Sequence, residues 1–263
     1  MTGRLIINRR RFLTLAGAGT SGMMLAGCDA WSGPDDTAPP RLLGQVDRFT
    51  DLAQRLFVGD QTLAREFTEA DISTHFRANG NTSVEGNEYR DVAFRSFRDY
   101  RLEVTGLVQQ PLSLSLDELR ALPSRTQITR HDCVEGWSSI GKWTGAHLST
   151  ILDMAGLQPE ARFVVFYCYD QLDQAQLGQL NYYESIGLVD AYHPQTILAY
   201  GMNDRDLPIP HGAPLRLRVE RQLGYKMPKY IRSIEVVASF AGIGEGQGGY
   251  YEDGDGYEWY AGI

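Results

Sequence analysis

The chain has 263 residues, of which 43% are hydrophobic and 11% aromatic, so it can bury one large core or two small ones. Its formal net charge is −8, and it becomes −12 if the first 27 residues, with their four arginines and no acidic residue, are removed. A protein this acidic is poorly suited to bind nucleic acid or an anionic membrane surface.

The first 27 residues have the pattern of an export signal. A twin arginine, Arg9-Arg10, precedes an apolar stretch from Phe12 to Ala26, which is short and rich in glycine. Such a stretch is too short to span a membrane as a helix. The twin arginine predicts the Tat route, which exports proteins that are already folded and loaded with cofactor.

The signal ends in Leu25-Ala26-Gly27-Cys28, which resembles a bacterial lipobox. We expect Cys28 to become the lipidated first residue of the mature protein, and the alternative is an ordinary cleavage site nearby. Residues 28–45 then form a linker, since the Pro- and Asp-containing stretch 31–40 favours no regular structure. The sequence therefore predicts a periplasmic or other extracytoplasmic protein that is anchored to the membrane by lipid.

Hydrophobic periodicity predicts a mixture of helices and strands in the rest of the chain. Apolar residues recur at helical spacing over 46–57 and 148–155, and Ser115 to Glu118 forms a capping-box pattern ahead of a short helix. Strands are predicted over 101–108, 163–169, 196–202 and 215–219, with a turn at 203–206 and a polar loop over 71–81.

Cys133 lies in the most distinctive stretch, Thr129 to Ser138, just ahead of a Gly, a Trp and an apparent helix start. A thiolate here would bind a soft metal or act as a nucleophile, whereas burial as a small core residue is the commoner fate of a free cysteine. A disulfide with Cys168 is a further alternative, and it excludes metal binding by Cys133. Cys168, at the end of a continuous apolar run, is most simply a core residue.

A second block begins with His211-Gly-Ala-Pro-Leu-Arg216 and continues over 224–231. Alternation along 215–219 places Arg216 and Arg218 on the same strand face, and we expect Arg218 to be solvated. A bound phosphate needs fixed cationic donors, which a guanidinium and an ammonium supply together. Arg216 and Lys229 are therefore the candidate phosphate ligands.

Together the two blocks resemble the sulfite-oxidase superfamily of molybdopterin-dependent oxidoreductases. The carrying residues are Cys133-Val-Glu-Gly-Trp-Ser138, Trp143-Thr-Gly145, the His211 to Arg216 pattern and Gly224 to Ile231. The resemblance implies an α+β fold, a mixed-sheet molybdopterin-binding domain over 46–240 as a single domain, with Mo-molybdopterin as cofactor. It also implies that Cys133 is the catalytic residue and the single protein ligand to molybdenum.

The same resemblance implies further cofactor contacts. Beside Arg216 and Lys229, His211 would hydrogen-bond a ring edge, and Met227 and Pro228 would offer backbone contacts. The other implied contacts are Arg77 and Asn79, with Cys168 as a weaker candidate, whereas the roles of His75, Asn81 and Lys226 stay open. His131, Asp132 and Trp137 flank Cys133, where shaping the substrate pocket, packing and an outer hydrogen bond are open alternatives.

Residues 241–263 form a tail rich in Gly, Tyr and acidic residues. We expect the tail to wrap over the domain, because Asp253 and Asp255 lack the further ligands of an EF-hand loop. Sulfite oxidases of the superfamily carry a large C-terminal dimerisation domain, and this tail leaves no room for one. The three cysteines also exclude a C-x-x-C-H haem attachment, so electrons must pass through a separate protein.

This arrangement resembles the catalytic subunits of periplasmic methionine sulfoxide reductases, which pair with a haem-bearing membrane protein. It implies an exported, monomeric catalytic subunit that transfers an oxygen atom to or from a small molecule and exchanges electrons with a haem- or quinone-linked membrane subunit. The alternatives are a sulfite dehydrogenase-like enzyme and a cofactor-free, lipid-anchored binding or assembly protein.

Overall fold

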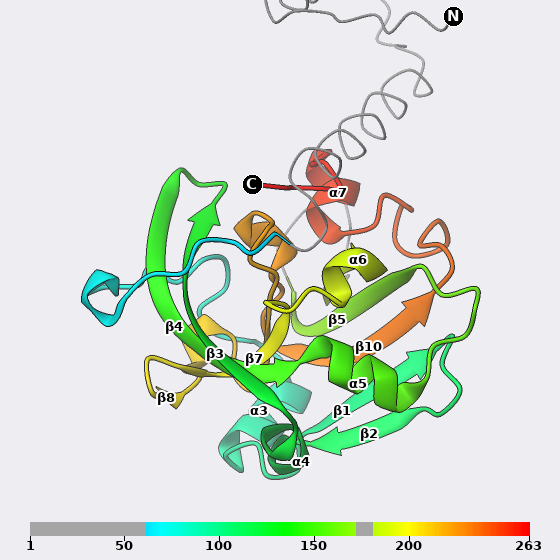
Figure 1. Ribbon diagram of the computed structural model, residues 1–263. Coiled ribbons are helices and arrows are strands. Elements are labelled where there is room, and N and C mark those ends of the chain that lie inside the picture. The colour runs from blue at the N-terminus through cyan, green and yellow to red at the C-terminus, as the bar shows by residue number, and fades with distance from the viewer. Residues whose placement is uncertain (1–61, 172–180) are drawn as a thin grey trace, which may run out of the picture. The chain divides into compact units, whose positions relative to one another are not determined.

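The computed structural model describes residues 62–171 and 181–263, and within them two β-sheets with short helices between and around their strands (Figure 1). The predicted export signal, the lipidation at Cys28, the linker and the helix over 46–57 lie outside these residues. No helix of the described part is both long and apolar enough to cross a membrane.

The first sheet is mixed. Its strands, in spatial order, are β2 (Leu112–Ser115), β1 (Arg101–Gly106), β10 (Ile231–Val237), β5 (Phe163–Gln171) and β6 (Asn181–Gly187). Strands β1 and β10 pair in parallel, and the other neighbours are antiparallel. The predicted strands over 101–108 and 163–169 are confirmed as β1 and β5.

The second sheet is antiparallel. Its strands, in spatial order, are β3 (Ser124–Cys133), β4 (Trp137–His147), β7 (Ile197–Met202) and β8 (Arg205–Asp206), and β9 (Arg216–Arg218) also pairs with β7. Figure 1 shows β3 and β4 as one long curved hairpin. The strands predicted over 196–202 and 215–219 are confirmed as β7 and β9.

The expectation of a helix start just after Trp137 is wrong, because β4 pairs with β3 from Trp137 to Ala146. The alternation of apolar and polar residues that predicts a strand is absent from β4, because its inward face carries Ser139 and Gly141 beside Trp143.

The helical segments are short. They are η1 (Glu69–Asp71), α3 (Asn87–Phe94), α4 (Leu116–Ala121), α5 (Leu148–Ala155), α6 (Leu188–Ala191), η2 (Ile209–His211), η3 (Gly224–Lys226) and α7 (Tyr250–Asp255). The capping box is confirmed, because Ser115 Oγ accepts from Glu118 N at 3.2 Å while Glu118 Oε2 accepts from Ser115 N at 2.7 Å. The predicted helix over 148–155 is confirmed as α5, and Gly156 follows it with a φ of 66°.

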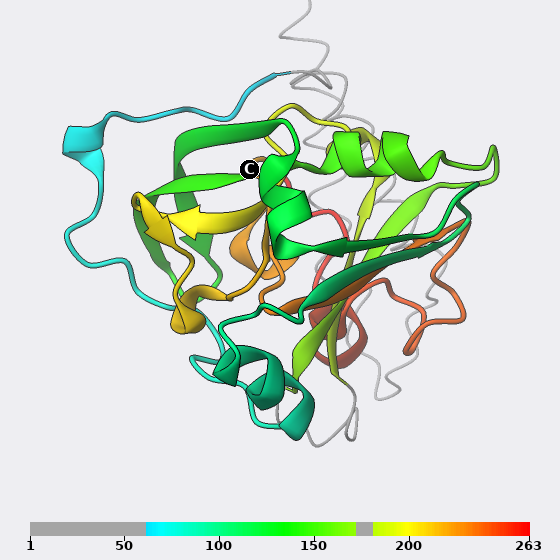
Figure 2. The same cartoon turned by 90° about the horizontal axis from the view of Figure 1, so that it is seen from below.

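Figure 2 shows the two sheets as separate layers. The main core joins residues of both sheets, such as Phe166 and Ile234 from the first and Leu198 and Leu217 from the second, and α5 adds Ile151 to it. A smaller cluster lies on the second sheet, and its members are Phe76, Trp143, Ile197, Ala199, Met202 and Leu207. The tail packs on the domain as expected, because Tyr250 is fully buried and Trp259 Nε1 donates to Ser185 Oγ at 2.9 Å.

Candidate functional site

The tip of the β3–β4 hairpin positions Cys133. Cys133 and Trp137 are cross-strand partners, and the turn between them closes with a hydrogen bond of 3.0 Å from Gly136 N to Cys133 O. Gly136 has a φ of +83°, a conformation that favours glycine. Alternation along β3 points Gln127, Thr129, His131 and Cys133 to one face, and the first three are buried. Cys133 is half-buried and unoxidised at the end of this row.

A cavity lies beside Cys133, and its empty space is about 510 Å³ when the open mouth is counted. It is bounded by the loop 79–81, the hairpin tip, the segment around η3 and single residues of β5, β6 and α7. The lining residues are Asn79, Gly80, Asn81, Cys133, Val134, Glu135, Asp170, Tyr182, Gly224, Tyr225, Met227, Pro228, Lys229 and Tyr251.

Two buried cations meet at one side of this cavity. Arg216 is fully buried on β9 and donates to Asn79 Oδ1 at 3.0 Å and to the carbonyl of His211 at 3.3 Å. Lys229 Nζ donates to the carbonyls of Asn79 at 2.6 Å and Pro210 at 3.0 Å, and to that of Asn81. These acceptors are all neutral oxygens, so neither cation hydrogen-bonds a carboxylate. The attraction of Asp170 for Lys229 and of Glu220 for Arg216 offsets only part of the cost of burying the two charges.

The pKa values reflect this incomplete compensation. Burial, with repulsion from Arg216, lowers the pKa of Lys229 to about 7. Burial, with repulsion from Arg218, lowers the pKa of Arg216 to about 9. The same two causes, burial first and then Arg216 and Lys229, lower the pKa of His211 to about 4. A bound anion would remove the destabilisation that these low values record.

Several buried polar atoms near the cavity have no partner in the described chain. They include Arg216 Nε, His211 Nδ1, His131 Nε2 and Asp170 Oδ1. Burial raises the pKa of Asp170 to about 6, although Asn81 Nδ2 donates to its other oxygen at 3.2 Å. Because these buried donors and acceptors lack partners, the ligand of this site is expected to be polar rather than purely apolar.

The structure brings most of the candidate residues together. Asn79, Cys133, Met227, Pro228 and Lys229 line the cavity. Arg216 reaches the same place through its bond to Asn79. His211 lines a second cavity with Phe76 and Met202, and it is linked to the first only through its carbonyl, which accepts from Arg216. The two sequence blocks and the polar loop therefore meet around Arg216 and Lys229.

Two candidates lie elsewhere. Arg77 is exposed, and it pairs with Glu135 Oε2 at 3.3 Å and lies over the Trp137 ring at 5.5 Å. Cys168 is fully buried in the main core and is not part of the lining. Since both cysteines in the described residues are free, no disulfide joins Cys133 and Cys168. The cofactor contacts of Arg77 and Cys168 stay predictions.

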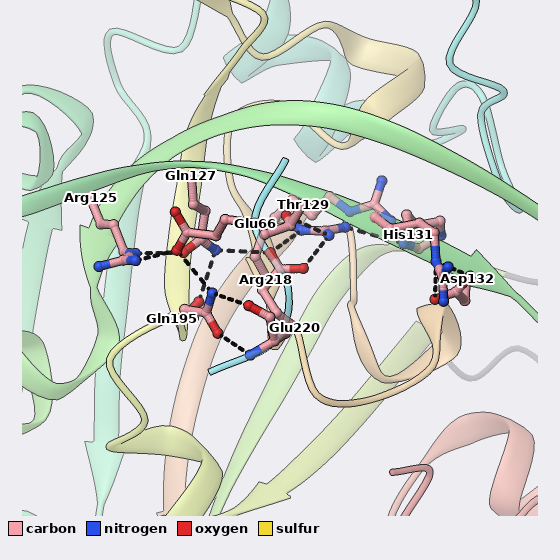
Figure 3. Close-up of polar contacts among 12 residues, drawn as sticks. Glu66, Arg125, Gln127, Thr129, His131, Asp132, Gln195, Arg218 and Glu220 are labelled. Atoms are coloured by element: carbon pink, nitrogen blue, oxygen red, sulfur yellow. Dashed lines mark hydrogen bonds and ion pairs between the residues drawn. The ribbon is translucent and has the colours of Figure 1, made fainter. Parts of the chain in front are cut away.

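The expectation that Arg218 is solvated is wrong. Its side chain is fully buried and forms an ion pair of 2.6 Å with Glu220, which is also buried (Figure 3). Its guanidinium lies 4.4 Å from the centre of the Trp143 ring. The strand alternation was correct, but the face that carries Arg216 and Arg218 is an interior one. Partners from β3 and β4, far away in sequence, make this burial tolerable.

Asp170, Tyr182 and Tyr251 also line the cavity, and no sequence pattern singled them out individually. Asp170 is a charged residue at the end of an apolar strand, which is a usable signal of function. Tyr251 enters from the tail, whose position on the domain no local pattern encodes. Lys226, left open, forms a buried cluster with Glu184 at 2.5 Å and Glu252 at 2.6 Å. This cluster fastens α7 to the segment that carries Met227 and Lys229.

Residues 89–241 match the family of the oxidoreductase molybdopterin binding domain. The chain belongs to this family. It is a molybdenum-dependent oxidoreductase, and its cofactor is molybdopterin.

Relatives extend this family match over most of the chain. It is 38% identical over 96% of its length to the "putative protein-methionine-sulfoxide reductase subunit YedZ1" of Azospira oryzae, 86% of which is covered. It is 30% identical over 88% of its length to the "protein-methionine-sulfoxide reductase catalytic subunit MsrP" of Campylobacter jejuni, 74% of which is covered. Among solved structures, the sulfane dehydrogenase SoxCD of Paracoccus pantotrophus matches 54% of this chain and 39% of its own at 23% identity, with a TM-score of 0.47.

The residues at the cavity fit this cofactor. Arg216 and Lys229 supply two buried positive charges that hydrogen-bond no carboxylate, as a phosphate requires. His211 Nδ1 and Asp170 Oδ1 are unpartnered and suit the polar edges of a pterin ring. Cys133 offers the soft thiolate that suits molybdenum. In the free chain burial raises the pKa of Cys133, and a bound metal would hold it deprotonated.

Proposed function

We propose that this oxidoreductase transfers oxygen atoms at a molybdenum centre held by Cys133, and that it acts as a methionine sulfoxide reductase. The observation that carries the proposal is that Cys133 and Lys229 line the same cavity, and that the buried cations Arg216 and Lys229 both donate to Asn79, another lining residue. The names of the two most extensively aligned relatives support the substrate class.

In this proposal the chain's residues divide the work of binding. Arg216 and Lys229 hold the phosphate, His211 and Asn79 hydrogen-bond the ring, and Met227 and Pro228 contribute backbone contacts. When bound, molybdopterin supplies the two-electron redox chemistry of oxygen transfer, whereas the protein fixes orientation, access and charge.

The cavity mouth suits a thioether-like substrate. Val134 is exposed at the hairpin tip, and Tyr225 and Tyr251 also line the cavity, so apolar and aromatic surface is available to a methionine side chain. Glu135 lies at the same tip, where Arg77 and Trp137 hold its carboxylate. The open mouth would admit a sulfoxide carried on a peptide as well as a free one.

The electron donor is proposed to be a separate haem- or quinone-linked membrane subunit. The two relatives are named as subunits, and this chain has no haem-attachment motif. The twin arginine and the lipobox at Cys28 support Tat export and a lipid anchor that would keep the enzyme near such a partner.

The test is a comparison of substrates with natively exported protein and a reduced viologen dye as electron donor. Peptide methionine sulfoxide should oxidise the dye, and C133S should lose turnover by more than about 100-fold. C168S tests the weaker predicted contact of Cys168 separately, and a loss of molybdenum from that variant would support the contact. Turnover of sulfite but not of sulfoxide would favour the sulfite dehydrogenase alternative, and an active C133S variant would refute the role of Cys133.

A further inference from the structure

His131 occupies a distinctive place in β3. Its side chain is fully buried on the strand face that also carries Cys133, two residues away. At about 3.3 Å per strand residue, the two residues are separated by about 7 Å along β3. The ring nitrogen Nε2 of His131 is buried and has no partner in the described residues. The other ring nitrogen is bound.

Arg218 fixes the tautomer of His131. Arg218 Nη1 lies 3.1 Å from His131 Nδ1 (Figure 3). A guanidinium can only donate, so Nδ1 must be the acceptor and must carry no proton. The proton of the neutral imidazole is therefore on Nε2. This makes Nε2 a buried hydrogen-bond donor without an acceptor.

Arg218 is held firmly enough to impose this choice. Its Nε and Nη2 donate to the two carboxylate oxygens of Glu220 at 2.9 and 2.6 Å. Glu220 also accepts from Gln127 Nε2 at 2.9 Å, and Gln127 is bonded in turn to Arg125 at 2.9 Å. Figure 3 shows this row of side chains running beneath β3 from Arg125 to His131. The row orients the imidazole and leaves only Nε2 available.

The Nε2 side of the His131 ring packs against Gly224, a residue of the cavity wall. A Cβ atom built on Gly224 would lie 2.5 Å from Nε2 and 2.4 Å from Cε1 of His131, so only glycine fits against this ring. Gly224 itself lines the cavity. His131 is not itself a lining residue, and its ring reaches the cavity wall only because Gly224 carries no side chain.

We propose that His131 is a further cofactor-binding residue, which donates its Nε2–H to an acceptor atom of bound molybdopterin. Cys133, on the same strand face, would hold the metal of the same cofactor. A buried donor that finds no acceptor is costly, and the cofactor is rich in nitrogen, oxygen and sulfur acceptors. The inference rests on the family's cofactor and on the proposed site at Cys133, and it is independent of the substrate.

Two variants separate the donor from its support. In H131N the amide oxygen can take the place of Nδ1 and accept from Arg218, but no atom replaces Nε2. In H131Q the longer amide can return a donor near the position of Nε2 while the contact with Arg218 is weakened. We expect H131N to release molybdopterin about 10- to 100-fold faster than wild type, and H131Q to fall within about threefold of it. Equal losses in both variants, or no loss in H131N, would overturn the proposal.

A spectroscopic measurement on the full wild-type chain tests the hydrogen bond without relying on the cofactor affinity of a variant. Histidine ¹⁵N resonances of apo and cofactor-loaded protein, assigned with H131Q, should show Nε2 protonated in both states. The Nε2–H signal should shift when the cofactor binds, because the group then donates to an acceptor atom of the cofactor. An unchanged signal in loaded protein would mean that an ordered water satisfies His131, and it would refute the proposal.

These readouts also separate the possible failures. Wild-type protein that binds molybdopterin but does not reduce sulfoxides would refute the proposed substrate. The His131 experiment would be unaffected. Wild-type protein that is fully loaded with cofactor, but whose His131 Nε2–H signal does not change on loading, would refute this inference alone.

Discussion

The incompletely compensated charge of Lys229 predicts how the stability of the apoprotein depends on pH. Burial lowers the pKa of Lys229 from its ordinary 10.5 to about 7. Between these values the unfolded chain holds more protons than the folded one, so the free energy of unfolding should rise with pH. The whole difference corresponds to about 5 kcal/mol at about 1.4 kcal/mol per pH unit, and about 2–3 kcal/mol of it should appear between pH 7 and pH 9.

Urea unfolding of apoprotein and of K229M, at several pH values, measures this contribution as a difference. The free energy of unfolding of wild type should rise by about 2–3 kcal/mol relative to that of K229M from pH 7 to pH 9, because the methionine does not titrate. K142M is a control, because the hydrogen bonds that Lys142 donates to Asp204 and Glu69 raise its pKa, and its contribution should therefore be constant over this range.

Cofactor binding should abolish the effect. An anion beside Lys229 returns its pKa towards the ordinary value, so holoenzyme should show a much smaller difference from K229M between pH 7 and pH 9. A flat difference in apoprotein would refute the claim that Lys229 is an incompletely compensated buried cation. The same steep difference in holoenzyme would refute the claim that the cofactor's anion lies beside it.

Three further predictions concern the packing around the site, and urea unfolding tests each. K226M should lose about 3–5 kcal/mol in the free energy of unfolding, because the negative charge that Glu184 and Glu252 share would be left buried without its cation. A loss below about 1 kcal/mol would show that the cluster does not hold the tail. E184Q should become progressively more stable than wild type as pH rises above about 4.5, because burial and then Glu252 hold the pKa of Glu184 well above that ordinary value; an unchanged difference from pH 5 to pH 8 would contradict it. G224A should lose about 1–3 kcal/mol through overlap with the His131 ring, whereas the double variant G224A/H131A should recover part of that loss.

The secondary structure could be predicted where a local rule dominates. The capping box at Ser115, the apolar run of β5 and the helical spacing of α5 each follow from neighbouring residues, and each is confirmed. Strand β4 could not be predicted, because serine and glycine on its inward face break the alternation on which the prediction depends. Its register comes from β3 and β7.

The candidate site divides in the same way. The residues that converge on the cavity were predicted from two sequence blocks whose pattern resembles the family. The burial of Arg218 was missed because two of its contacts, His131 on β3 and Trp143 on β4, are far away in sequence and meet it only in the folded domain. Tyr251 was missed for the same reason, since the tail reaches the cavity through the long-range pairing of Lys226 with Glu252.

The position of Cys133 at the cofactor is the claim on which the account depends most. Molybdenum-edge X-ray absorption of natively loaded wild-type and C133S protein tests it directly. The account predicts molybdenum in the wild-type protein and one fewer sulfur neighbour in C133S. Wild-type protein without molybdenum, made in a strain that synthesises the cofactor, or C133S with an unchanged set of sulfur neighbours, would contradict it.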